Sequence, residues 1–345
     1  MNIEILKIQE LESKDECDWN AYVEAMPAAT FFHRIEWKRL LEETYGFAGR
    51  YLLAKRAGAI CGILPLAHVR RFPFPPALIS SPLCVYGGAV ADADDIARDL
   101  EDAAAGLAES LEVAYLELRN LNRLREGWPV SNRMATFRKQ ISDSHDANMQ
   151  AIPRKARAEV RKGIKRGFTV TADRDLSQFM PAYARSVRDL GSPVFAKRYF
   201  QALFDTFGKD CRIKTLLLDG SVRVSLMSFY FKNEVLPYYA GATPDAHRDA
   251  AYAFLYWNLM REAVEEGCRV FDFGRSTVGT GAYDFKRFWG FEPTLLNYQH
   301  HLVTASKAPD VNPANPKYRF AIKTWQKLPL PVANLLGPLV SKAVV

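Results

Sequence analysis

Apolar residues recur with helical spacing in two segments of the chain, and each segment ends at a glycine. The first segment contains Trp37, Leu40, Leu41 and Tyr45 and ends at Gly46. The second contains Tyr199, Phe200, Leu203, Phe204 and Phe207 and ends at Gly208. Spacings of three and four residues place such side chains on one face of a helix, and glycine commonly follows the end of a helix. The pattern therefore predicts two amphipathic helices, 162 positions apart.

The segments that follow these two helices also correspond. In the first copy the predicted strands span 51–54 and 60–66, and in the second copy 215–218 and 222–231. A short turn that ends in glycine, Gly58 or Gly220, joins each pair, as expected for a β-hairpin. The offset between these glycines is the same 162 positions. The repetition predicts a duplicated unit.

Each predicted hairpin leads to a long amphipathic helix and then to a further strand. The tripeptide Tyr-Gly-Gly at 86–88 and Tyr-Ala-Gly at 239–241 precede these helices, and the last strands span 115–120 and 270–276. The order helix, hairpin, strand, long helix, strand predicts a mixed α/β fold and not a purely alternating one. It is the order of N-acetyltransferase (GNAT) domains, so we expect tandem GNAT-like domains. Two unrelated α/β halves with common helix and turn signals are the alternative.

Composition and missing motifs narrow the possible classes. The 345 residues are 48% hydrophobic and 25% charged, which is typical of a globular chain long enough for two domains. The five cysteines are far apart and mostly lie in apolar stretches, which favours reduced core thiols over disulfides or a metal site. The sequence contains no Cys-x-x-Cys, His-Glu-x-x-His, phosphate-binding Gly-rich loop or Gly-x-Ser-x-Gly motif. We therefore expect no metal and no tightly bound cofactor.

Positive charge is concentrated in one segment. The net charge is +7, and seven of the cations fall within residues 154–166. Arg154, Arg157, Arg161 and Lys165 share one stripe of a predicted helix. Two interpretations are open: the stripe binds a polyphosphate, a tRNA backbone or a lipid-linked pyrophosphate, or it is a solvated helix face.

Three segments of the second half resemble a known family. They are the basic helix at 152–167, the strand end at 271–276 that contains Asp-Phe-Gly, and the Phe-Lys-containing stretch at 283–291. These resemble the Fem-type transferases, aminoacyl-tRNA-dependent enzymes with two GNAT-like lobes that add amino acids to cell-wall (peptidoglycan) precursors. The resemblance implies a first lobe at 1–147, a second lobe at 148–305 that carries the active site, and an extension at 306–345.

The whole span 19–302 resembles the FemAB-related proteins associated with exosortase (PEP-CTERM) and exopolysaccharide loci. The shared phrases lie at 29–34, 84–88, 192–195 and 279–286. The resemblance implies transfer of an acyl or aminoacyl group to an amine or hydroxyl of an envelope saccharide or peptide precursor, lipid-linked or free. The chain lacks the long charged helical hairpin of many tRNA-dependent members and also the usual coenzyme A pyrophosphate motif. The anionic donor therefore stays open between aminoacyl-tRNA and acyl-coenzyme A.

Lys286 is the first candidate for the chemistry. It falls on the signature lysine of the family, where a cation can hold a phosphate or carboxylate or stabilise an oxyanion. Arg275 follows a strand end, where its guanidinium could bind a phosphate or carboxylate with two hydrogen bonds. Asp272 and Asp284 are the nearest acids in the sequence and are candidates for orienting or deprotonating the acceptor amine. A surface position for Lys286 and salt-bridge roles for the other three are the structural alternatives.

Further candidates surround these residues. Gly279, Thr280 and Gly281 are candidates for an anion-binding turn, and Ser276 lies beside Arg275 at the same strand end. Tyr239 is a candidate for an acceptor groove, with a core position as the alternative. On the basic helix, Arg154, Arg157 and Arg161 are candidates for substrate binding.

Features of the sequence near its two ends bear on where in the cell the protein is located. The N-terminus shows no secretory signal, and no run of about 18 apolar residues suggests a membrane span, so we expect a cytoplasmic protein. The apolar, proline-interrupted tail from 325 onward follows several cations. It either rests on the inner face of the membrane or packs on the second lobe. A coenzyme A-dependent N-acyltransferase, or a non-catalytic anion-, nucleic-acid- or membrane-binding protein, are the competing functions.

Overall fold

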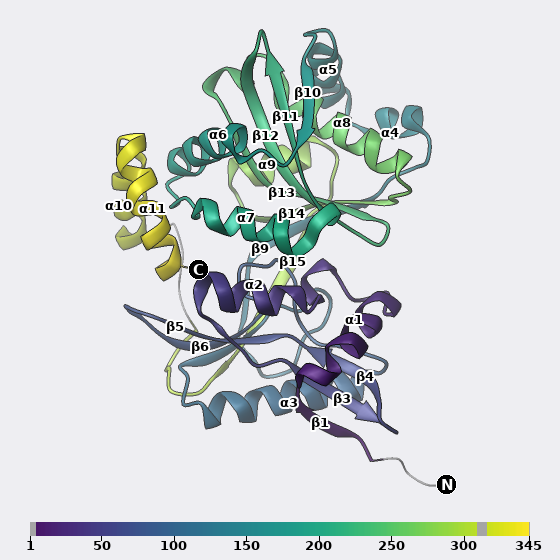
Figure 1. The fold of residues 1–345 in the computed structure, drawn as a ribbon, viewed down its shortest axis with the longest axis vertical. Helices are drawn as coiled ribbons and strands as arrows, with labels where there is room; N and C mark the ends of the chain where they lie inside the picture. Colours follow the sequence, from purple (N-terminus) through teal and green to yellow (C-terminus); the bar gives the residue numbers. More distant parts are fainter. Residues whose placement is uncertain (1–4, 309–315, 345) are drawn as a thin grey trace. The chain divides into compact units, whose positions relative to one another are not determined.

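The computed structural model of the chain describes residues 5–308 and 316–344 and divides into two compact units (Figure 1). The first unit comprises Met1–Met134, Leu296–Asp310 and Lys342–Val345, and the second comprises Ala135–Leu295 and Val311–Ser341. These limits differ from the predicted lobes because two strands, β9 (Val130–Gln140) and β15 (Thr294–Leu302), each begin in one unit and end in the other.

Among the described residues, the first unit contains two groups of strands and three complete α-helices. One sheet has the order β1 (Lys7–Glu10), β3 (Leu52–Arg56), β4 (Ala59–Leu64), β7 (Val90–Ala91). The other group runs in the order β15, β8 (Tyr115–Leu118), β6 (Phe74–Ser80), β5 (Leu66–Arg71), β2 (Ala48–Gly49). The helices are α1 (Glu16–Ala25), α2 (Glu36–Tyr45) and α3 (Asp94–Ser110), and α3 buries Ile96, Leu100 and Ala104 in the core.

The second unit contains one run of strands with helices on both faces. Its strands follow the order β10 (Thr169–Asp173), β11 (Cys211–Leu218), β12 (Ser221–Phe231), β13 (Glu234–Ala242), β14 (Val270–Thr277), β9. Its helices are α4 (His145–Ala151), α5 (Arg154–Ile164), α6 (Leu176–Asp189), α7 (Lys197–Phe207), α8 (Ala251–Glu265), α9 (Gly281–Phe288), α10 (Pro316–Gln326) and, as far as Ser341, α11 (Leu330–Val344).

Alternation along β12 decides which helix covers which face of this sheet. Leu226 belongs to the core formed with α5 and α8. Phe229 lies three residues after Leu226, and its ring centroid is 6.1 Å from that of Phe207 in α7. Because successive side chains of a strand point to opposite faces, α8 and α7 cover opposite faces of the sheet.

The structure confirms the duplication that the sequence predicts. Both hairpins turn through two residues with positive φ, 50° and 84° at Ala57 and Gly58, and 52° and 71° at Asp219 and Gly220. Such a pair matches the twist of a tight hairpin. In each unit a strand that comes after this hairpin then pairs in parallel with the strand that follows the long helix: β6 pairs with β8, and β13 pairs with β14. The predicted mixed α/β class is likewise confirmed.

The prediction of one continuous strand at 60–66 is wrong. β4 ends at Leu64 and β5 begins at Leu66, and the two belong to different groups of strands. Pro65 lies between them and has no N–H to donate to a ladder, so the chain changes sheet there. The equivalent strand of the second unit, β12, contains no proline and runs unbroken.

The glycine of the Tyr-Gly-Gly phrase has a packing role. A Cβ atom added at Gly88 would lie only 1.7 Å from Oδ1 of Asn120, and the Gly88 carbonyl oxygen is 3.0 Å from Nε2 of His33. Asn120 in turn donates to the buried Glu101. Gly88 and the residues that contact it therefore stabilise the interior of the first unit.

Candidate active site

Lys286 lies on α9 and reaches back to the end of β14. Its Nζ donates hydrogen bonds of 3.0 Å to the carbonyl oxygens of both Gly274 and Arg275. The same atom lies 5.4 Å from the ring centroid of Phe137. Burial lowers the pKa of Lys286 to about 7; the negative charge of Asp272 opposes this shift, and the positive charge of Arg275 adds to it. The amine can therefore take up or release a proton near neutral pH.

Gly274 shapes the backbone that holds this lysine. It has a left-handed conformation inside β14, with φ of 65°. An L side chain is strained in that region, so glycine suits the position. The turned peptide lets the Gly274 N–H donate to Oδ1 of Asp272 at 2.7 Å while its carbonyl accepts from Lys286. The backbone turn thus connects the predicted acid to the predicted lysine.

Asp272 is completely buried and belongs to a network that no motif in the sequence indicates. Arg138 of β9 donates to both carboxylate oxygens of Glu234, at 3.1 and 2.8 Å, and its Nε is 3.3 Å from Oδ2 of Asp272. Thr136 also donates to Asp272. Burial and the charge of Asp272 raise the pKa of Glu234 to about 8, although Arg138 opposes the shift. The pair of carboxyls thus holds a proton at neutral pH.

The other predicted residues of this region lie on β14 and α9. Arg275 is half-buried, whereas Ser276 is buried and its Oγ has no hydrogen-bond partner among the described residues. Asp284 is exposed on α9. The structure therefore brings Lys286, Arg275 and Asp272 together and leaves Asp284 on the outer side of the same helix.

The glycine-containing turn forms the start of α9. Gly279 has φ of 79°, and Gly281 is the first residue of the helix. Thr280 is the N-cap: its Oγ1 donates to the Thr277 carbonyl at 2.8 Å and accepts from the Tyr283 N–H at 3.4 Å. A hydroxyl at this position stabilises the first turn of a helix. The three residues are exposed, and Thr280 has a clear structural role.

Tyr239 lies in the core between β13 and the α6–α7 pair. Its hydroxyl is 2.9 Å from that of Tyr199, and its ring packs edge-on against Phe200. It is 8% exposed. This position matches the core alternative for Tyr239 and does not place it in an open groove.

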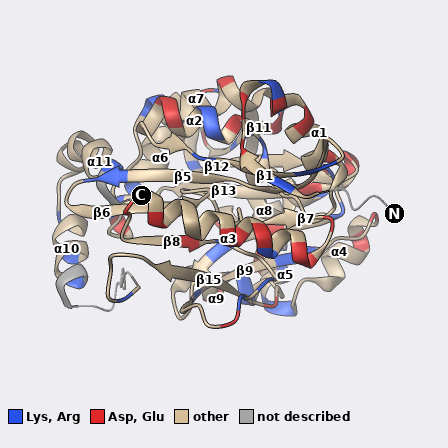
Figure 2. Ribbon diagram, turned by 90° about the horizontal axis from the view of Figure 1, so that it is seen from below, with Lys and Arg blue, Asp and Glu red and all other residues tan. Residues whose placement is uncertain are grey.

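The predicted basic stripe is on α5. Arg154 and Arg161 are exposed and Arg157 is half-buried. Figure 2 colours the lysines and arginines of the chain blue, and blue segments lie along α5. Near the end of the helix lies a hollow of about 570 Å³, lined by Ala158, Arg161, Lys162, Lys165 and Arg166. We call this the basic hollow. Two of its cations have acidic neighbours, Glu159 at 3.7 Å from Lys162 and Asp249 at 3.6 Å from Arg166. A hollow lined by four cations suits an anion with several charges.

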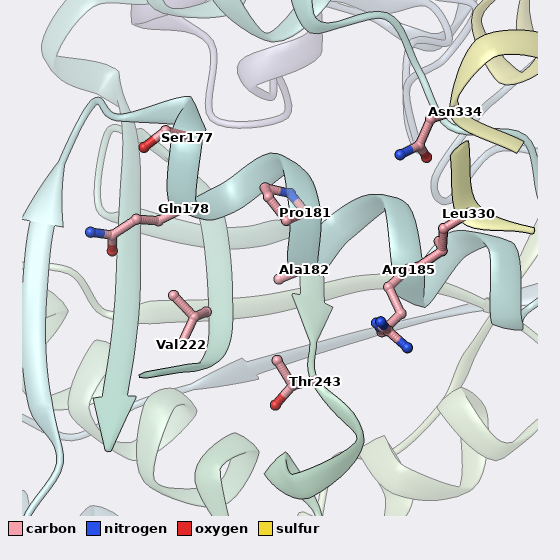
Figure 3. Close-up of a pocket in the computed structure, with 9 residues that line it drawn as sticks. All are labelled: Ser177, Gln178, Pro181, Ala182, Arg185, Val222, Thr243, Leu330 and Asn334. Atoms are coloured by element: carbon pink, nitrogen blue, oxygen red, sulfur yellow. The ribbon is translucent and has the colours of Figure 1, made fainter. Parts of the chain in front are cut away.

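A second hollow, of about 400 Å³, lies beside α6 (Figure 3). Five of its lining residues come from α6, and Leu330 and Asn334 come from α11, with Leu330 beside Arg185. Arg185 is the charged residue of the lining, and no residue predicted to act in the site lines it. This second hollow therefore shares no lining residue with the candidate site around Lys286.

Within the described ranges, no three His, Cys, Asp or Glu side chains are grouped so that they could bind a metal. Over the same ranges, no helix combines the length and the apolar composition that crossing a bilayer requires.

Comparison with known proteins identifies the enzyme class of the second unit. Residues 154–287 match the family described as an acetyltransferase (GNAT) domain. This span contains α5, the sheet from β10 to β14 and Lys286. The match characterises the protein as an acyl-type transferase. No curated protein sequence matches the chain.

Solved structures share the tandem arrangement. The crystal structure of FemX is 14% identical, covers 86% of this chain and 98% of its own, and has a TM-score of 0.68. A tandem GNAT protein from the clavulanic acid biosynthesis pathway is also 14% identical, with coverages of 88% and 100% and a TM-score of 0.56. L-PGS from Bacillus licheniformis is 12% identical, with coverages of 93% and 99% and a TM-score of 0.50. The chain therefore has the Fem-like tandem GNAT fold that the sequence predicts.

Proposed function

We propose that the second unit transfers an acyl or aminoacyl group from an activated donor to an amine, and that Lys286 is the base of this reaction. The observation that carries the proposal is the environment of the Lys286 amine, which is held by two backbone carbonyls and has a pKa of about 7. An ordinary lysine is protonated at this pH and cannot accept a proton.

The hydrogen bonds of Lys286 suit this role. A neutral amine has two N–H groups and one lone pair, and the carbonyls of Gly274 and Arg275 accept both N–H groups. The lone pair then remains to accept a proton from the attacking amine as its nitrogen bonds to the acyl carbon. The C–O or C–S bond to the donor breaks, and the leaving group receives the proton from the lysine ammonium. A hydroxyl acceptor would require the same proton transfers.

Neighbouring residues have supporting roles in the proposal. Asp272 is enclosed by Arg138, Thr136 and the Gly274 amide, which supports a positioning role and leaves no space for the acceptor amine. Arg275 and the buried Ser276 hydroxyl are the groups we assign to the developing oxyanion or to an anionic part of the substrate. The exposed Asp284 is our candidate for holding the acceptor ammonium before it loses its proton.

The basic hollow supports a donor that carries phosphate groups. Aminoacyl-tRNA and acyl-coenzyme A both carry phosphate groups, which the cations of the hollow would attract. The helix that carries these cations, α5, packs closely on α8: a Cβ added at Gly163 would lie 2.7 Å from Cβ of Phe254. We propose that Arg154, Arg157 and Arg161 guide such a donor. From the family resemblance, we propose as acceptor a saccharide or peptide precursor of the cell envelope or of an exopolysaccharide, as in exosortase-associated systems, in the cytoplasm.

The test is transfer of label from two donor pools into an envelope-precursor extract. One pool contains tRNA charged with labelled amino acids, and the other contains labelled acyl-coenzyme A. Label entering from one pool identifies the donor class. Label from neither pool, with active FemX-type and GNAT controls in the same extract, would contradict the proposed function.

A further inference from the structure

α11 buries its smallest residues and contacts Val194 of the second unit at Gly337. Ala333, Gly337 and Ser341 recur every four positions and are buried. A Cβ added at Gly337 would lie 2.5 Å from Cγ1 of Val194 and 2.9 Å from its backbone nitrogen. At 100° per residue these three positions share one face of the helix. The buried face of α11 is therefore the face with the least apolar side-chain volume.

The large apolar residues of α11 point the other way. Val332, Leu335 and Leu339 fall on the opposite face and are 39%, 74% and 69% exposed, and Leu336, at the side of that face, is 38% exposed. Phe320 of α10 is 74% exposed. A helix on the surface of a soluble domain normally directs its apolar stripe to the core. Here the stripe faces outward, so a partner with an apolar surface would cover it.

Charge identifies the kind of partner. Residues 311–345 contain five lysines and arginines and no aspartate or glutamate. Arg319, Lys323 and Lys327 are exposed, and none forms an ion pair with any residue that the structure describes. Leucines combined with cations alone are typical of helices that lie on an anionic bilayer, where the acyl chains receive the leucines and the headgroups attract the cations.

We propose that the surface formed by Phe320, Val332, Leu335, Leu336 and Leu339 together with Arg319, Lys323 and Lys327 docks on an anionic lipid bilayer. We call it the C-terminal surface. The two helices have 11 and 15 residues, which is enough to lie in the interface and too short to cross it. Such docking would hold the transferase beside a lipid-linked acceptor, but the proposal does not depend on the reaction.

The test is sedimentation of the full chain with vesicles of phosphatidylcholine alone or with added phosphatidylglycerol. We expect binding to the anionic vesicles that weakens with salt. The double variant Leu335→Ser, Leu339→Ser should lose most binding. Lys323→Gln with Lys327→Gln should lower the partition coefficient on anionic vesicles by about tenfold or more, since each cation near such a surface contributes about 1 kcal/mol. Leu124→Ser with Leu295→Ser, exposed leucines elsewhere, is the matched control.

Three results would overturn the proposal. The first is no binding of wild type to anionic vesicles. The second is equal binding of wild type and both double variants whose thermal unfolding is unchanged. The third is a wild-type dimer that the leucine variant converts to a monomer while vesicle binding is absent, which would assign the C-terminal surface to a protein contact.

Discussion

Lys286 donates a 3.0 Å hydrogen bond to the carbonyl oxygen of Gly274, twelve residues earlier in the chain. The bond joins a helix side chain to a left-handed residue of a strand, and the N–H of that same glycine contacts the buried Asp272. Backbone atoms thus hold the lysine, and the negative charge of Asp272 raises its pKa through space. This arrangement keeps the amine in place in both its protonated and its neutral form.

Transfer activity should depend on pH through Lys286. Its amine must be neutral to accept a proton, so the rate at low substrate should rise as pH increases through about 7 and then level off. Lys286→Arg stays protonated over this range and should lack the rise. Comparing both proteins with one acceptor, from pH 5.5 to 8.5, separates the lysine from titration of the acceptor. A wild-type profile parallel to that of the variant would contradict the assignment.

Glu234 should make stability depend on pH in the opposite direction. Its folded-state pKa, about 8, lies above the ordinary value of 4.5, so the folded chain holds a proton that the unfolded chain releases. The stabilisation is fully present below about 4.5 and is lost as pH rises toward 8. Glu234→Gln should remove this loss. Urea unfolding at pH 5, 6, 7 and 8 measures it, with the exposed Glu292→Gln as control. Parallel curves for wild type and Glu234→Gln would show that Glu234 is not protonated as described.

The packing of α6 on β13 depends on a glycine. A Cβ at Gly241 would lie 2.2 Å from both Cα and N of Tyr183, and backbone atoms cannot move aside cheaply. Gly241→Ala should lower the free energy of unfolding by about 2 kcal/mol or more. Gly106→Ala is the matched control, because Gly106 lies inside α3 with no atom within 4 Å of its added Cβ. That change should be neutral or raise stability by about 0.5–1 kcal/mol. Equal stability of the two variants would contradict the close contact.

Local patterns were sufficient to predict much of the fold. The glycine after α2, the turn at Asp219-Gly220 and the helical spacing in α3 are all set by residues near one another in the chain. The break at Pro65 was missed because the prediction followed the apolar run and ignored the missing N–H of proline. The outward leucines of α11 were not predicted either, because periodicity does not show which face of a helix packs on the protein.

The site was only partly predictable for the same reason. Lys286, Arg275 and Asp272 are close in sequence, and the family resemblance placed them together. Arg138 and Glu234 are 96 residues apart, and neither lies in a motif. A signal was nonetheless present: Glu234 is an acid between predicted apolar strands, where a buried carboxylate needs a cation.

The basic hollow should affect donor binding more than the chemical step. Arg161→Glu with Lys165→Glu reverses two of its four cations, so the rate at low donor concentration should fall by about tenfold or more while the rate at saturating donor changes little. The salt dependence of donor binding should weaken as well. Lys197→Glu, an exposed cation at the start of α7, is the control. Unchanged donor dependence in the double variant would mean that the hollow is merely solvated.

In the proposed reaction the Lys286 amine takes the proton during acyl transfer. The most direct measurement is the single-turnover rate of transfer at saturating donor, compared among wild type, Lys286→Ala and Arg287→Ala, the last removing the adjacent exposed cation of α9. We expect a rate at least about 100-fold lower for Lys286→Ala and near wild type for Arg287→Ala. A folded Lys286→Ala protein that transfers the acyl group at the wild-type rate would contradict it.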